Sequence, residues 1–149
     1  MPTEDYRARS TQFREQGDAS FAAENWDDAI LSYAKAISAL QKTGQLDFEA
    51  LGKRSAAYAE LGQYGRALED ANKGLEADGH WIEGWRRKGL AYFCLGHFER
   101  SRDACRLGLE LAPYDEVLLE GLSEAEQIVQ RGATEIERGN FSFKEGDYE

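Results

Sequence analysis

Apolar and polar residues alternate along most of the chain with the period of an α-helix. Between residues 85 and 113, apolar residues recur at helical spacing, which predicts two short amphipathic helices. Trp85, Gly89 and Tyr92 fall on one face of the first helix. Pro113 ends the second helix, because proline has no backbone N–H to donate. One such pair cannot bury its own apolar face, so the pattern requires neighbouring pairs.

The same pattern occurs 34 residues earlier in the chain. The positions that agree in residue type are Tyr58 and Tyr92, Leu61 and Leu95, Gly62 and Gly96, Tyr64 and Phe98, Gly74 and Gly108, and Leu75 and Leu109. A fixed period of this length, with small and aromatic residues at set positions, resembles the tetratricopeptide repeat (TPR). The resemblance implies an all-α fold, namely an α-solenoid of three helix hairpins with a C-terminal capping helix and the start of a fourth repeat. An ordinary helical bundle with an accidental period is the alternative.

The repeat pattern divides the chain into six segments. We expect a flexible leader at 1–9, repeats at 10–47, 48–81 and 82–114, a capping helix at 115–131, and a truncated fourth repeat at 132–149. The first repeat is longer because extra residues fall between Gln41 and Asp47, which predicts a longer helix and a loop at Thr43 and Gly44. The last segment stops before its second helix, so we expect the chain to be a piece of a longer multi-repeat protein. A natural C-terminal tail is the alternative.

Composition and charge narrow the classes of function. The chain of 149 residues has a net charge of −10, which argues against nucleic acid or an anionic membrane as the main partner. It has no run of eighteen apolar residues and therefore no predicted membrane span. Cys94 and Cys105 are too few for a disulfide framework, so we expect a cytoplasmic protein. His80 and His97 lie in predicted turns without partner ligands, and we expect no metal or cofactor.

Function in stacked hairpins is expected on the concave surface, which the first helices line. The residues predicted to face this groove and to bind a ligand are Arg14, Asp18, Lys53, Arg86, Arg87 and Leu90. Basic residues thus gather in one groove of an acidic chain. Arginine binds carboxylates with two parallel hydrogen bonds, so such a groove favours an acidic or C-terminal peptide. The alternative is that these are ordinary solvated charges.

The second repeat is similar to the TPR domains of co-chaperones. Those domains hold the C-terminal Glu-Glu-Val-Asp of the seventy- and ninety-kilodalton heat-shock chaperones in a clamp of lysines, asparagines and an arginine. Arg14 and Arg87 keep the charge of clamp residues, and Lys53 replaces an asparagine. Asp18 replaces the other asparagine and Glu83 replaces a lysine, and both would repel a carboxylate. The resemblance therefore implies a degraded clamp, with weak, altered or absent binding of that tail.

Two classes of function remain open. The first is an adaptor, similar to a co-chaperone, that binds a peptide in the groove. The second is a structural scaffold or self-association module, in which the truncated C-terminal helix could join two copies of the chain. An enzyme is not expected, because the sequence lacks a nucleophile elbow, a phosphate-binding loop and a metal-ligand cluster.

Overall fold

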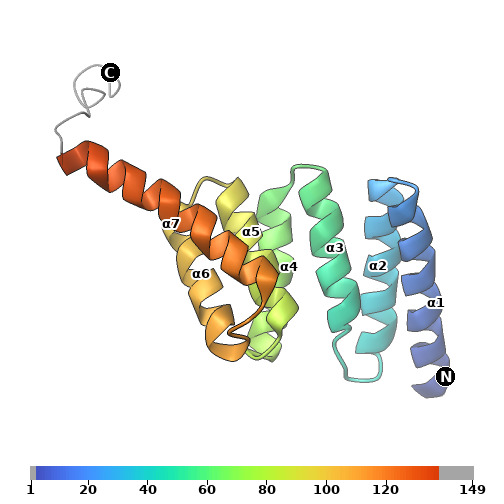
Figure 1. Ribbon diagram of the computed structural model, residues 1–149. Coiled ribbons are helices and arrows are strands. Elements are labelled where there is room, and N and C mark those ends of the chain that lie inside the picture. Colours follow the sequence, from blue (N-terminus) through green and yellow to red (C-terminus); the bar gives the residue numbers. More distant parts are fainter. Residues whose placement is uncertain (1–2, 138–149) are drawn as a thin grey trace.

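The described part of the computed structural model, residues 3–137, is built from antiparallel helix pairs stacked side by side (Figure 1). Its seven helices are α1 (Thr3–Ala22), α2 (Trp26–Gln41), α3 (Phe48–Glu60), α4 (Tyr64–Ala77), α5 (Ile82–Cys94), α6 (Phe98–Leu111) and α7 (Glu116–Glu137). Helices α1 to α6 form three hairpins, and α7 packs on α6 and α5 and runs obliquely across them. These described residues contain no strand, and the predicted all-α solenoid is confirmed.

Each hairpin turns at one residue in the left-handed backbone region. Gly62 has a φ of 75° and Gly96 has a φ of 82°, a conformation that glycine adopts without steric cost. Glu24 occupies the equivalent place in the first hairpin, with a φ of 59°. The three hairpins therefore turn at equivalent positions of the repeat, including the first one, which has no glycine there.

The predicted flexible leader at 1–9 is wrong from residue 3 onward, because α1 already begins at Thr3. The long helix α2 reaches Gln41 and gives these first turns a partner to pack against. Lys42 Nζ lies 5.5 Å from the centroid of the Tyr6 ring, and the Ser10 side chain is buried. Packing between the two helices thus orders a segment whose own sequence is mostly polar and charged.

The C-terminal helix also extends beyond its predicted end. We expected a capping helix at 115–131, and α7 continues to Glu137. It enters the segment that the sequence assigns to the start of a fourth repeat. The remainder of that segment, residues 138–149, lies outside the described residues.

The indole of Trp81 fills the junction between the second and third hairpins. Gly52, Gly74 and Gly84 face it, and a Cβ atom built on Gly74 would lie 2.1 Å from the indole Cζ3. The Phe48 ring lies edge-on to the indole, with the ring centroids 5.5 Å apart. The three glycines therefore make the space that this large side chain needs.

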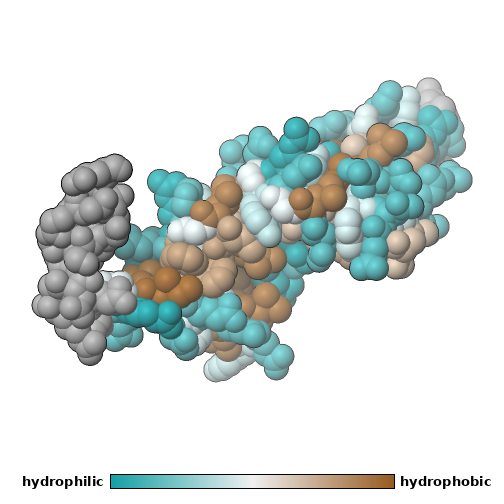
Figure 2. Space-filling model, turned by 90° about the horizontal axis from the view of Figure 1, so that it is seen from above, coloured by the Kyte–Doolittle hydropathy of each residue, from teal (hydrophilic) through white to brown (hydrophobic). Residues whose placement is uncertain are grey.

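Figure 2 shows one face of the molecule, on which brown hydrophobic areas lie among teal hydrophilic residues. Among the described residues, none of the helices combines the length and the apolar character that a membrane span requires.

Candidate functional site

Three first helices meet at one cavity, which brings together Asp18 of α1, Lys53 of α3 and Arg87 of α5. We call it the α1–α3–α5 cavity. It has a volume of about 430 Å³ and is lined by Asp18, Phe21, Ala22, Tyr33, Gly52, Lys53, Ala56, Glu83 and Arg87. Residues far apart in the sequence share this cavity because the hairpins stack in chain order, so that residues of three first helices line it together.

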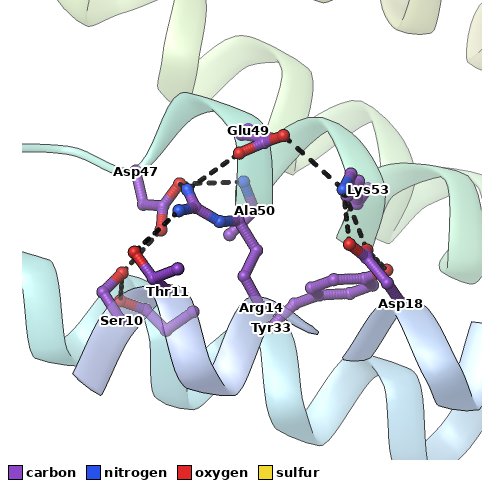
Figure 3. A network of polar contacts seen from close by, with 10 residues as sticks. Ser10, Thr11, Arg14, Asp18, Tyr33, Asp47, Glu49, Ala50 and Lys53 are labelled. Carbon is purple, nitrogen blue, oxygen red and sulfur yellow. Dashed lines mark hydrogen bonds and ion pairs between the residues drawn. The ribbon is translucent and has the colours of Figure 1, made fainter. Parts of the chain in front are cut away.

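Lys53 is already bound to carboxylates of the chain itself (Figure 3). Its Nζ donates to both oxygens of Asp18 at 2.9 Å, and it lies 3.6 Å from Glu49 Oε1. The Tyr33 hydroxyl donates to Asp18 Oδ1 at 2.7 Å. Asp18, predicted from the sequence as a repulsive residue, is therefore the partner of Lys53 in this structure.

Tyr33 reaches the cavity from α2, a helix from which no ligand-facing residue was predicted. A Cβ atom built on Gly17 would lie 2.6 Å from Tyr33 Cε1, so the glycine opens the path for this ring. Burial and the hydrogen bond to the Asp18 carboxylate raise the pKa of the Tyr33 hydroxyl, which keeps it a neutral donor. No periodicity in the sequence links Gly17 to Tyr33, because the two residues belong to different helices.

Arg14 lies at the contact between α1 and α3. Its Nη1 lies 3.3 Å from Asp47 Oδ1 and 2.8 Å from Glu49 Oε2. The Asp47 side chain is only 2% exposed and also accepts the backbone N–H of Ala50, which caps α3. Because its carboxylate partner is buried, Arg14 stabilises the junction between the first two hairpins.

Arg86 and Arg87 share Glu83 on α5. Arg86 Nη1 donates to Glu83 Oε1 at 3.0 Å, and Arg87 Nε donates to Glu83 Oε2 at 2.9 Å. Arg86 also binds Asp115, with its Nε 2.9 Å from Oδ2. From the sequence we expected Glu83 to repel a carboxylate ligand. In the structure it forms ion pairs with both arginines and neutralises part of their positive charge.

A second cavity lies between α5, α6 and α7, and we call it the α5–α7 cavity. Its volume is about 370 Å³. Arg86, Arg87 and Leu90 line it, so it contains the remaining predicted site residues other than Arg14. Arg14 lines neither of these two cavities.

The ion pairs repeat along the solenoid. The equivalent positions at the three junctions are Arg14 with Asp47, Gly52 with Trp81, and Arg86 with Asp115. The same arginine–aspartate contact therefore closes the first and third junctions, and Trp81 packed against Gly52 replaces it at the second. This contact can be recognised from the repeat spacing in the sequence. Asp47 directly precedes the first helix α3, and Asp115 directly precedes the capping helix α7.

A second repeated signal lies within the helices. Glu49 precedes Lys53 by four residues and Glu83 precedes Arg87 by four, and each pair lies within 4 Å. Glutamate four residues before a basic residue is the favoured order for an ion pair on a helix. All four predicted cations of the groove thus have acidic partners in the chain, and the groove lacks the free positive charge that the sequence suggested.

Comparison with known proteins identifies the fold. No family model matches the chain. Over 118 residues, 79% of this chain, it is 30% identical to Hsp70-Hsp90 organizing protein 2 of Arabidopsis thaliana, of which it covers 20%. It is similar to the Sgt2 TPR domain from Aspergillus fumigatus, with a TM-score of 0.77, 25% identity, and coverage of 84% of this chain and 82% of that one. The chain has the fold of a TPR domain, and it is similar to the TPR domains of co-chaperones.

A further neighbour shares the fold of this TPR domain. The first TPR of Spaghetti (RPAP3), bound to the HSP90 peptide SRMEEVD, has a TM-score of 0.76 and 22% identity, and covers 83% of this chain and 95% of that one. The TPR domain spans between a fifth and about a third of the length of the curated relatives that it matches.

The TPR domain has no obvious metal site in its described part. No group of three or more histidines, cysteines, aspartates and glutamates lies close enough there to hold an ion. Cys94 is an exposed free thiol and Cys105 is a buried one.

Asp115 gives the TPR domain a pH-dependent contact at the start of α7. It accepts the backbone N–H of Leu118 at 3.0 Å, and the hydrogen bond from Arg86 lowers its pKa. We expect Asp115→Asn to lower the free energy of unfolding by about 1 kcal/mol at about pH 7. Because the pKa is lower in the folded state than the unfolded value of about 3.9, this contribution is present above that value and is lost as the pH falls through the folded-state pKa.

Urea denaturation followed by circular dichroism, at about pH 7 and about pH 3, measures this difference. The exposed Asp103, which pairs with Arg102 on α6, provides the control Asp103→Asn. A loss of stability that is the same at both pH values would contradict the assigned role of Asp115.

Proposed function

We propose that this TPR domain is a protein-interaction adaptor that binds an acidic or C-terminal peptide segment in the groove of α1, α3 and α5. The observation that carries the proposal is the α1–α3–α5 cavity, to which two separate helices bring Lys53 and Arg87. These side chains are 35% and 28% exposed, so a ligand can reach them. Charge-assisted hydrogen bonds from lysine and arginine are the strong interactions available to a peptide carboxylate.

The comparisons support the same class of ligand. The first TPR of Spaghetti (RPAP3) is bound to the HSP90 peptide SRMEEVD, and several relatives of this chain are named as Hsp70-Hsp90 organizing proteins. A heat-shock chaperone tail is therefore the first ligand to test.

Carboxylates of the chain itself should make this groove bind a peptide less tightly than a groove whose lysine and arginine are unpaired. A peptide carboxylate has to compete with Asp18 for Lys53 and with Glu83 for Arg87. Each exchange replaces one ion pair by another, so the net gain per contact is smaller than for an unpaired cation. We therefore propose modest affinity, with specificity from several contacts together.

Titration of the labelled peptide SRMEEVD by fluorescence anisotropy tests the proposal. We expect Lys53→Ala and Arg87→Ala each to weaken binding about fivefold, because each removes a charged donor that faces the cavity. Binding should also weaken as salt is added, because these cations are partly exposed. Arg14→Ala is a poor probe, because it would leave the buried Asp47 carboxylate without this partner.

The control is Arg102→Ala, which removes an arginine on α6 that pairs only locally with Asp103 in the described part. Amidation of the peptide C-terminus, which removes one negative charge, should also weaken binding. If the peptide does not bind, or if both groove variants bind like Arg102→Ala, the domain is not this kind of receptor.

The second candidate is a structural scaffold or self-association module. Exposed hydrophobic residues beside the α6–α7 turn favour such contacts, since Tyr114 is 89% exposed and Leu111 is 40% exposed. A homo-oligomer through the C-terminal segment 132–149 belongs to this candidate. Light scattering of the full chain distinguishes a monomer from a dimer.

We propose a binding role and no catalysis, because the polar side chains of the groove are engaged in ion pairs with one another. We also propose a cytoplasmic location, which the two free thiols and the co-chaperone relatives support. A protein or peptide, and no nucleic acid or membrane, is the proposed partner.

A further inference from the structure

Another cavity lies between α1 and α2, away from the groove, and we call it the α1–α2 cavity. Its volume is about 210 Å³, and it is lined by Tyr6, Arg9, Phe13, Lys35, Ser38, Ala39 and Lys42. Arg9 and the groove residue Asp18 are nine residues apart, which at about 100° per residue places them on opposite sides of α1. A ligand in this cavity therefore leaves the α1–α3–α5 cavity free.

The described residues that line the α1–α2 cavity include three cations and no acid. Arg9, Lys35 and Lys42 are all exposed. No ion pair is found for any of them among the residues that the structure describes, whereas Arg14 and Lys53 are paired with carboxylates. In a chain with a net charge of −10, this cavity thus concentrates positive charge that the chain itself leaves unpaired.

Aromatic rings hold two of these cations in place. Lys42 Nζ lies 5.5 Å from the centroid of the Tyr6 ring, and Lys35 Nζ lies 5.8 Å from the centroid of the Phe13 ring. The face of an aromatic ring attracts a cation but does not neutralise its charge. The two lysines therefore lose less side-chain freedom when an anion binds, and their charges remain available to it.

The helix ends beside the cavity carry opposite partial charges. The pair is antiparallel, so α1 begins, at Thr3, next to the end of α2 at Gln41 (Figure 1). The partial positive charge at the start of α1 offsets the partial negative charge at the end of α2. The three cationic side chains therefore determine the charge of the cavity, and the exposed Ser38 adds a hydroxyl that can donate to an anion.

We propose that the α1–α2 cavity binds a phosphate group carried by a side chain of a partner protein. The Arg9 guanidinium donates two parallel hydrogen bonds to phosphate oxygens, and Lys35 and Lys42 add two further charges. A phosphate monoester has close to two negative charges and three acceptor oxygens, so it matches three cations better than a carboxylate with one charge does. The net charge of −10 opposes the approach of an extended anionic surface, whereas a single phosphate needs only local contact. This site is independent of peptide binding in the groove.

Titration of short peptides into the full chain, followed by the NMR shifts of its backbone amides, tests the proposal. The peptides are Ala-Gly-X-Gly-Ala, in which X is phosphoserine, phosphotyrosine, glutamate or serine. We expect at least one phosphopeptide to give saturable shifts in residues 35–42 and the serine peptide to give none. The glutamate peptide should bind at least about tenfold more weakly than that phosphopeptide, because it offers a single charge.

The double variant Arg9→Gln/Lys42→Gln removes one cation from each helix. It should weaken binding of the phosphopeptide about tenfold, since two charge-assisted contacts are lost. The matched control, Lys73→Gln/Arg100→Gln, removes two exposed cations of α4 and α6 that do not line the α1–α2 cavity, and should change the affinity by less than about twofold. Circular dichroism of both variants checks that the fold is retained.

The proposal is overturned if neither phosphopeptide binds, or if the two double variants weaken binding equally. Binding of the chain to phosphatidylserine vesicles without binding of a phosphopeptide would assign the cavity to a membrane instead and would also overturn it. The peptide SRMEEVD in excess should leave the affinity for the phosphopeptide unchanged. Displacement by this acidic peptide would show a site for carboxylates in general. Because this comparison does not require SRMEEVD to bind in the groove, the site and the adaptor function stand or fall separately.

Discussion

Trp81→Ala is expected to lower the free energy of unfolding by about 3 kcal/mol, the scale of deleting a large aromatic side chain from a packed site. The indole contacts Gly52, Gly74 and Gly84 and lies edge-on to Phe48. These glycines have no side chains that could move into the space, so the cavity left by the substitution would stay largely empty. Chemical denaturation followed by circular dichroism measures the loss.

Tyr114→Ala is the control for this prediction. Tyr114 is also a large aromatic residue, but it is 89% exposed, so its removal should change the stability by less than about 0.5 kcal/mol. Equal effects of the two substitutions would show that the second and third hairpins do not depend on the indole for their contact.

Asp18→Asn is expected to tighten binding of SRMEEVD about tenfold, the value of one hydrogen bond to a charged group. The substitution removes the carboxylate that occupies Lys53 through two contacts of 2.9 Å. Asparagine has the same size and still accepts the hydrogen bond from the Tyr33 hydroxyl, so the cavity should keep its shape. It is also the residue that the co-chaperone clamp carries at this position.

Asp103→Asn makes the same chemical change on the exposed surface of α6 and controls for the general loss of negative charge. Its effect on peptide binding should be less than about twofold. If Asp18→Asn binds the peptide no better than this control, the internal carboxylate does not compete with the ligand, and the proposed modest affinity has another origin.

The repeat pattern predicts the fold because residues at equivalent positions have the same structural role in each repeat. Gly62 and Gly96 make the turns, and Glu24 takes the same backbone conformation in the first copy. The pattern also places Lys53 and Arg87 on facing first helices. Their ion pairs with glutamates four residues earlier follow from helix geometry alone, and so were predictable from the sequence.

Contacts between helices are less accessible to such reasoning. Nothing in the spacing shows that Tyr33 crosses from α2 past Gly17 to reach Asp18. The order of residues 3–9 depends on packing against α2 rather than on their own composition. The acidic side of the α5–α7 cavity, formed by Glu120 and Glu124, appears only when α7 is laid across α5.

The sequence alone determined the helices, their turns, the number of complete hairpins and the helix faces that carry charge. These features depend on the spacing of residues along the chain, which can be read from a periodic sequence. The tertiary structure alone decided that Asp18 of α1 neutralises Lys53 of α3 and that two cavities share the Glu83–Arg87 pair. Those features depend on distances between side chains of different helices, which the angle and offset of packing set and which a linear pattern does not contain.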